Sequence, residues 1–125
     1  MMTNKEFAKT LEKRTRQFAV EVMRRGCHQL STRLPKTPEA RVIKSQLTDA
    51  GTSVGANYRE ANRSRSRADF RNKMKICEGE CSETQYWLEV IVEAEMLDWK
   101  QVKPVYDECC ELLAIFTSAL DSLSQ

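Results

Sequence analysis

Apolar residues recur every three or four positions along most of the chain, a period that predicts α-helices rather than strands. The pattern divides the chain into four helical segments, at about 4–33, 38–62, 66–97 and from 104 onward. No stretch alternates apolar and polar residues over a useful length, as a half-buried strand would. Long helices with short connections predict an all-α fold, an antiparallel up-down-up-down four-helix bundle that forms a single domain over residues 1–125.

Each segment has a set of residues that we expect to face the core. In the first segment these are Val20, Met23, Cys27, Leu30 and Leu34, with Phe7, Leu11, Phe18 and Val22 beside them. In the second they are Ile43, Leu47, Ala50, Val54, Asn57 and Ala61. In the third they are Phe70, Met74, Cys77, Cys81, Thr84, Leu88 and Ile91. In the fourth they are Val105, Cys109, Leu112, Phe116, Ala119 and Leu123, again at the spacing of packed helices.

Local signals predict where the helices begin. Thr37 followed by Pro38 is typical of an N-cap and the first helical residue after it. Ser66 and Asp69 have the spacing of a capping box. We expect residues 98–103 to separate the last two helices.

The middle of the second segment is unusually small, since residues 50–56 read AGTSVGA. Gly51 and Gly55 each cost a helix about 1 kcal/mol relative to alanine. Close packing of this helix against a neighbouring one could offset that cost, so we predict a close helix–helix contact here.

The overall composition limits the class of protein. Hydrophobic residues make up 41% of the chain and charged residues 30%, with four glycines and three prolines, which is typical of a helix-rich globular domain. There is no run of about 18 apolar residues for a membrane span, and the charged N-terminus lacks the apolar core of a secretory signal. We therefore expect a cytoplasmic protein with no membrane partner, whose five cysteines are reduced.

Residues that could catalyse a reaction or bind a metal are sparse. The single histidine, His28, follows Arg25 by three residues, so the Glu-x-x-His pairs of di-iron bundles are absent. Cys77 and Cys81 could bind a metal from one helical face, but their place on the apolar stripe favours buried core thiols. No Walker, dinucleotide-binding or hydrolase motif occurs. We expect no enzyme activity, no metal and no cofactor.

Charge is distributed unevenly along the chain. Residues 1–75 contain 18 Lys+Arg and 7 Asp+Glu, whereas residues 76–125 contain 2 and 11. Five arginines lie around the turn between the second and third helices: Arg59, Arg63, Arg65, Arg67 and Arg71. In an up-down-up-down bundle the start of the first helix adds Lys5, Lys9 and Lys13 at the same end. Such an end suits phosphates, so we predict that these arginines contact the backbone of RNA or DNA.

Arg67 and Arg71 are unusual because they open a helix, where positive charge is unfavourable, with only Asp69 to offset them. An alternative to phosphate binding is that the arginines pair with glutamates of a neighbouring subunit. A second polar group, formed by Asn57, Glu60 and Glu83, could make a layer near the core or between subunits.

Three stretches together resemble a known family: SVGANYREA (53–61), RSRSRADF (63–70) and EGECSETQYWLEV (78–90). They are similar to the four-helix-bundle family of ribosomal RNA intervening-sequence proteins, which includes the accessory variability protein of diversity-generating retroelements. The residues that match the family pattern are Ser53, Asn57, Glu60, Gly79 and Glu83.

The resemblance implies a bundle that assembles into a homopentameric ring and has no known catalysis. For the retroelement members it also implies binding to nucleic acid and to a reverse transcriptase. We therefore hypothesise a non-enzymatic oligomer that binds nucleic acid at the arginine-rich turn. The alternative is a structural or protein-interaction oligomer whose arginines serve subunit contacts.

Overall fold

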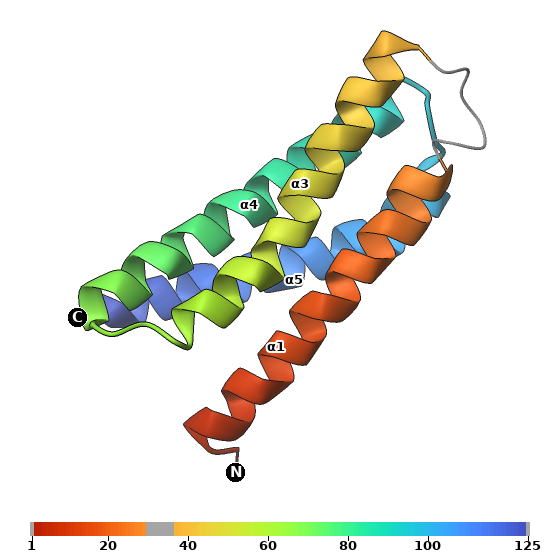
Figure 1. The fold of residues 1–125 in the computed structure, drawn as a ribbon. Helices are drawn as coiled ribbons and strands as arrows, with labels where there is room; N and C mark the ends of the chain where they lie inside the picture. Colours follow the sequence, from red (N-terminus) through yellow and green to blue (C-terminus); the bar gives the residue numbers. More distant parts are fainter. Residues whose placement is uncertain (1, 30–36, 125) are drawn as a thin grey trace.

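The computed structural model describes residues 2–29 and 37–124, and all regular structure within them is helical (Figure 1). The elements in chain order are α1 (Asn4–Glu21), η1 (Val22–His28), α3 (Pro38–Ala61), α4 (Arg67–Glu93) and α5 (Trp99–Leu123). Because η1 is a π-helical continuation of α1, the described residues form four long helices, as predicted. The predicted end of the first helix at Arg33 lies outside the described residues.

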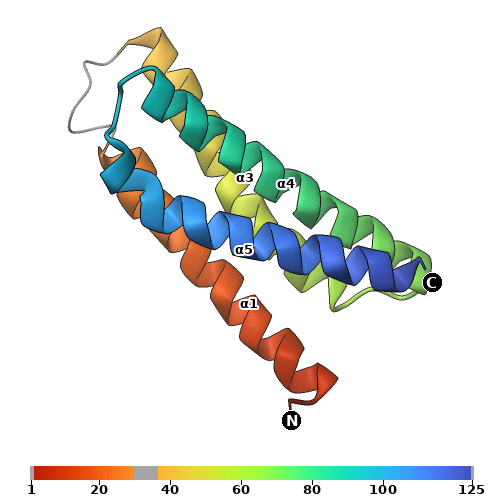
Figure 2. The ribbon, with the colours of Figure 1, turned by 180° about the vertical axis from the view of Figure 1, so that it is seen from behind.

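The four helices lie side by side as a bundle (Figures 1 and 2). α3 packs against α4 and α1, and α5 packs against α4 and, less extensively, α1. α1 and α4 therefore lie at opposite corners, with α3 and α5 between them. The turn at residues 62–66, the end of α5 and the start of α1 all lie toward one end of the molecule.

The apolar stripes predicted for the last two helices face the core. α4 buries Met74, Cys77, Cys81, Thr84, Leu88 and Ile91. α5 buries Val102, Val105, Cys109, Leu112, Phe116 and Leu120. The predicted Phe70 is only half-buried, and near the end of α5 Leu120 is buried whereas the predicted Ala119 and Leu123 are half-buried. A strict seven-residue repeat drifts on a 3.6-residue helix, which moves the buried position by one residue.

On α3 the core residue is Tyr58, one position beyond the predicted Asn57. Tyr58 is 3% exposed, and its ring meets Phe116 edge-on with centroids 5.7 Å apart. Asn57 is half-buried, and its Nδ2 donates to the carbonyl of Ser53 in the same helix at 2.8 Å. Burying a tyrosine ring removes far more apolar surface from water than burying an amide, which explains the rotation of the helix.

The core prediction for the first helix was right in part, because Leu11, Phe18 and Val22 are buried as expected. Val20 and Met23 are 44% and 42% exposed, whereas the buried residues are Leu11, Thr15, Phe18 and Val22. The first helix has two candidate apolar stripes, and the partner helix selects between them, as the glycine contacts show. The predicted burial of Cys27, Leu30 and Leu34 concerns side chains outside the described part.

Close approach of α3 to the first helix is confirmed at both glycines. A Cβ added at Gly51 would lie 2.7 Å from Cγ1 of Val22, well inside van der Waals contact. A Cβ added at Gly55 would lie 3.0 Å from Oγ1 of Thr15 and 3.2 Å from its backbone carbon. Thr15 and Val22 thus pack against the small residues of α3, and this contact determines which face of the first helix is buried.

The predicted caps of α3 and α4 form. The Thr37 hydroxyl accepts from the amide of Ala40 at 3.2 Å, and the Ser66 hydroxyl accepts from the amide of Asp69 at 3.0 Å. Each cap satisfies an amide that has no partner inside its helix.

The break between the last two helices lies earlier than the predicted residues 98–103, since α4 ends at Glu93 and α5 begins at Trp99. α5 begins at Trp99, because Asp98 and Gln101 form a capping box there. Pro104 lies inside α5. At this early position the proline removes a single intrahelical hydrogen bond, which the helix tolerates.

Candidate nucleic-acid interface

Arg59 forms an ion pair with an acid on α1 of the same chain. Its Nε lies 3.6 Å from Oε1 of Glu12, and the other oxygen of Glu12 accepts from Nδ2 of Asn62 at 3.1 Å. The ion pair is partly exposed, so it offsets the charge of Arg59 without burying it. Arg59 is therefore a weaker candidate for phosphate contact than its position in the sequence indicates.

Arg67 and Arg71 reach from the start of α4 to the end of α5. Nη2 of Arg67 donates to the carbonyl of Leu123 at 3.1 Å, and Nη2 of Arg71 donates to the hydroxyl of Ser124 at 3.4 Å. The last carbonyls of a helix lack intrahelical partners and carry partial negative charge, so cations are favourable there. The two arginines are misplaced with respect to their own helix but well placed for the neighbouring one.

Arg63 and Arg65 lie in the turn between α3 and α4 and are exposed. Within the part of the chain that the structure describes, neither side chain forms a hydrogen bond or an ion pair. The other three arginines predicted to bind phosphate each have a partner in the chain. Among the described residues, only Arg63 and Arg65 of the five have no partner for their guanidinium groups.

The start of α1 lies at the same end of the molecule. A surface hollow of about 300 Å³ joins α1 to the turn and to α5; its lining includes Asn4, Phe7, Asn62 and Phe70. The lysines predicted for this end, Lys5, Lys9 and Lys13, are exposed on α1. Phe7 is 47% exposed and adds an aromatic ring that sequence reasoning assigned to the core. We define the basic end as Lys5, Lys9, Arg63 and Arg65 with Phe7 beside them.

The polar residues of the family pattern do not form one layer within the chain. Sγ of Cys77 donates to the carbonyl of Val54 at 3.5 Å, which places these two residues opposite each other. Glu83 lies six residues farther from the connecting turn than Cys77, and Glu60 lies six residues nearer to it than Val54. At 1.5 Å per residue the two glutamates are about 18 Å apart along the bundle.

The remaining contacts of these residues are local. Glu83 is exposed and accepts from Nε1 of Trp87 at 3.3 Å, one helical turn away. Glu60 is exposed and Ser53 half-buried, and a Cβ added at Gly79 would have no neighbour within 4 Å. Contacts within the described chain therefore give Gly79 no structural role.

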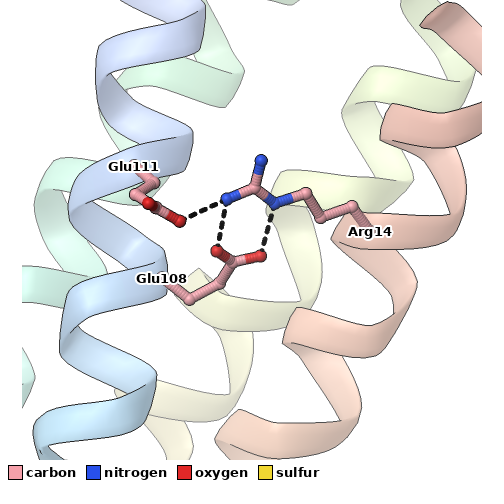
Figure 3. Close-up of polar contacts among 3 residues, drawn as sticks. All are labelled: Arg14, Glu108 and Glu111. Atoms are coloured by element: carbon pink, nitrogen blue, oxygen red, sulfur yellow. Dashed lines mark hydrogen bonds and ion pairs between the residues drawn. The ribbon is translucent and has the colours of Figure 1, made fainter.

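A polar cluster between α1 and α5 was missed by sequence reasoning (Figure 3). Arg14 donates from Nε and Nη2 to the two oxygens of Glu108, at 2.7 and 2.6 Å, and from Nη2 to Glu111 at 2.5 Å. The hydrogen bonds and charge of Arg14 hold the pKa of Glu108 below its ordinary value. The partners are 94 and 97 positions apart, so no local pattern could reveal them.

Cys77, Cys81 and Cys109 are buried core residues, and Cys110 is half-buried. Burial raises the pKa of Cys77 to about 12, and Sγ of Cys109 donates to the carbonyl of Cys81 at 3.1 Å. Thiols in this state are protonated and are poor nucleophiles or metal ligands. Across residues 2–29 and 37–124, no three His, Cys, Asp or Glu side chains are placed to hold a metal ion, and His28 is exposed. No helix in this part of the chain is long and apolar enough to cross a membrane.

Known proteins that resemble this chain match most of its length. The model of the family described as 23S rRNA-intervening sequence protein matches residues 5–118. A crystal structure of a protein with unknown function, from the S23 ribosomal protein family of Bacteroides thetaiotaomicron, has a TM-score of 0.76 and 31% sequence identity to this chain. The match covers 87% of this chain and 96% of that one. No curated protein gives a match. The resemblance first seen in residues 53–90 thus extends over most of the chain.

Proposed function

Because the chain belongs to the family of 23S rRNA-intervening sequence proteins, we propose that it is a non-enzymatic oligomer that binds nucleic acid at its basic end. The observation that supports this proposal most directly is the state of Arg63 and Arg65. Both are exposed on a turn, at the end of the molecule where α1 begins, and neither uses its guanidinium within the described chain. Donors in this state are available to phosphate oxygens.

Recognition would follow the nucleic-acid backbone. Arginines in an exposed turn and lysines on a helix face can contact phosphates, and the sequence contains no motif that reads base edges in a groove. Arg59, Arg67 and Arg71 would contribute to the positive field rather than make direct contacts, since each has a partner in the chain. Phe7 offers a ring on which an unpaired base could stack.

The proposal includes an antiparallel up-down-up-down bundle that assembles into a ring of identical copies, a pentamer by family resemblance, in the cytoplasm. The short turn between α3 and α4 and the bond from Arg67 to Leu123 support this order of the helices. Ser53, Asn57, Glu60, Gly79 and Glu83 would then be structural or interface positions. A reverse transcriptase would be a protein partner if this chain serves a retroelement.

Filter binding to a short RNA and a short DNA across a salt series tests the nucleic-acid contact. We expect affinity to fall with salt, and Arg63→Ala with Arg65→Ala to reduce the slope of log K against log salt by about 2. Arg41→Ala is the matched control, because Arg41 is exposed on α3 away from the turn. Absence of binding at about 50 mM salt, or affinity that ignores salt, would overturn the proposal.

The second candidate is a structural or protein-interaction oligomer without nucleic acid. It is favoured by the finding that Arg59, Arg67 and Arg71 already have partners within the chain. If the arginines left over serve subunit contacts, reversing the charge of Arg63 lowers the mass of the oligomer in light scattering. An unchanged mass counts against this second candidate.

A further inference from the structure

Two helices present surfaces on the sides of the bundle that no element of the described chain covers. The first, which we call the α1 surface, is formed by Arg16 and Val20 on α1 and by Met23 and Arg24 on its continuation η1. Val20 and Met23 are 44% and 42% exposed. Arg16 and Arg24 are exposed and form no ion pair with any described residue. Arg16, Val20 and Arg24 line a shallow hollow of about 660 Å³, together with Lys13, Gln17 and Glu21.

The second, which we call the α4 surface, is formed by Ile76, Gly79, Glu83 and Tyr86. Spacings of three, four and three residues place them in one stripe along the helix. Ile76 and Tyr86 are 43% and 57% exposed. Gly79, at the middle of the stripe, leaves open space where a Cβ would lie, so a second helix could approach the backbone of α4 closely there.

The two surfaces have opposite charge. Beside the α4 surface, Glu83 and Asp49 both lie close enough to Glu80 to repel its carboxylate. The pKa of Glu80 is raised, chiefly by burial and further by Glu83 and Asp49. None of the three carboxylates pairs with a cation among residues 2–29 and 37–124. The α1 surface has the complementary excess, two arginines around two apolar side chains.

One copy of the chain cannot bring these surfaces together. α1 and α4 lie at opposite corners of the bundle, and each packs against α3 and α5 (Figures 1 and 2). Their outer sides therefore face away from each other. Two different surfaces that meet between copies make a head-to-tail contact, which closes into a ring or continues as a filament.

We propose that the α4 surface of one copy docks on the α1 surface of the next. Val20 and Met23 pack over Ile76 and Gly79, and the arginines of the α1 surface face Glu83. The inference rests on the self-association included in the proposed function and identifies the two faces that carry it. It does not involve the basic end, which remains exposed for nucleic acid.

Light scattering of surface variants tests this docking. We expect Glu83→Arg alone, and Arg16→Glu with Arg24→Glu, to reduce the oligomer to single copies. All three positions are exposed, so circular dichroism should show unchanged helix content. The matched controls are Glu95→Arg and Lys100→Glu, exposed charges outside both surfaces, which should leave the mass unchanged.

Mixing the two defective variants separates a head-to-tail contact from other modes. The Glu83→Arg copy keeps an intact α1 surface, and the Arg16→Glu, Arg24→Glu copy keeps an intact α4 surface. The mixture should therefore form complexes of two or more copies although neither variant does so alone. A Gly79→Gln variant, which fills the open space on α4, should also lower the mass.

The outcomes distinguish a failure of self-association from a failure of the proposed docking. A wild-type protein that is a single copy at all concentrations would remove the self-association on which the docking rests. A wild-type oligomer whose mass survives the charge reversals and the glycine replacement would overturn the docking alone. A mixture that fails to assemble, although each variant has lost its own assembly, would overturn the head-to-tail arrangement.

Discussion

At the scale of single residues, the absence of a side chain decides how two helices meet. Gly51 leaves the space that Val22 fills, and Gly55 leaves the space for Thr15. Gly79 is different, because the described chain places nothing near it. The same residue type thus has two roles: Gly51 and Gly55 admit a helix of the same chain, whereas Gly79 is open on the surface.

We predict that Gly51→Ala destabilises the protein. The added Cβ would overlap Val22, and overpacking costs about 1–3 kcal/mol, whereas alanine gains about 1 kcal/mol in helix propensity. The expected net loss in the free energy of unfolding is about 1 kcal/mol, measured by urea denaturation. In a Val22→Ala background the space is open, so the same replacement should cost less or stabilise. A Gly51→Ala variant more stable than wild type would contradict this account.

At the scale of elements, α1 is joined to α5 by a specific polar contact. α1 packs less extensively against α5 than α3 packs against α4, and the ion pairs of Arg14 with Glu108 and Glu111 span that contact. About a third of the Arg14 and Glu108 side chains is exposed, so solvent weakens the pair. Geometry compensates in part, because two parallel hydrogen bonds fix the guanidinium against the carboxylate.

We predict that Arg14→Ala lowers the free energy of unfolding by about 1 kcal/mol near neutral pH. The pKa of Glu108 is lower in the folded than in the unfolded chain, so the contribution is present above the ordinary carboxyl pKa. It disappears as the pH falls through the folded value. Denaturation of both proteins between pH 7 and pH 3 should therefore show the difference shrinking in acid.

Lys103→Ala serves as the control for Arg14, since Lys103 forms only an exposed pair with Asp107 one turn away. Pairs of that kind contribute about 0.3–0.5 kcal/mol. An Arg14→Ala effect that persists unchanged at pH 3 would mean that packing of the arginine stem, rather than its charge, holds α1 to α5.

At the scale of the whole molecule, the excess of basic residues in the first 75 positions and of acidic residues in the rest is only partly neutralised inside the chain. Arg14 pairs with two acids of the other half, whereas Arg59 pairs with Glu12, an acid of its own half. Charges without a partner among the described residues remain at the basic end, on the α1 surface and beside the α4 surface. Nucleic acid and a second copy are the partners proposed for these charges.

We predict that salt weakens self-association but not the fold of each copy. Raising salt from 0.1 M to 1 M shortens the screening distance from about 10 Å to about 3 Å, which weakens exposed charge pairs most. Light scattering should show that a higher protein concentration is needed for assembly in 1 M salt, while circular dichroism stays unchanged. Assembly that strengthens with salt would indicate an interface governed by apolar contacts.

The helices and most of the core could be predicted from the chain alone, because the period of burial is a local property of a helix. The stripes of α4 and α5 and the caps at Thr37 and Ser66 were predicted on this basis and are confirmed. The family was also recognisable, since its motifs lie within short stretches between residues 53 and 90. The clustering of arginines near one turn was equally visible, because those residues are neighbours in sequence.

Which stripe of α1 is buried, and which arginines remain unpaired, depended on residues far away in the sequence. Val22 meets Gly51, Arg59 meets Glu12, and Arg67 meets Leu123. Van der Waals contact and hydrogen bonding act over only a few ångströms, so they exist once the helices are packed and leave no periodic trace in the chain. The tertiary structure therefore narrowed the candidate phosphate ligands from five arginines to Arg63 and Arg65.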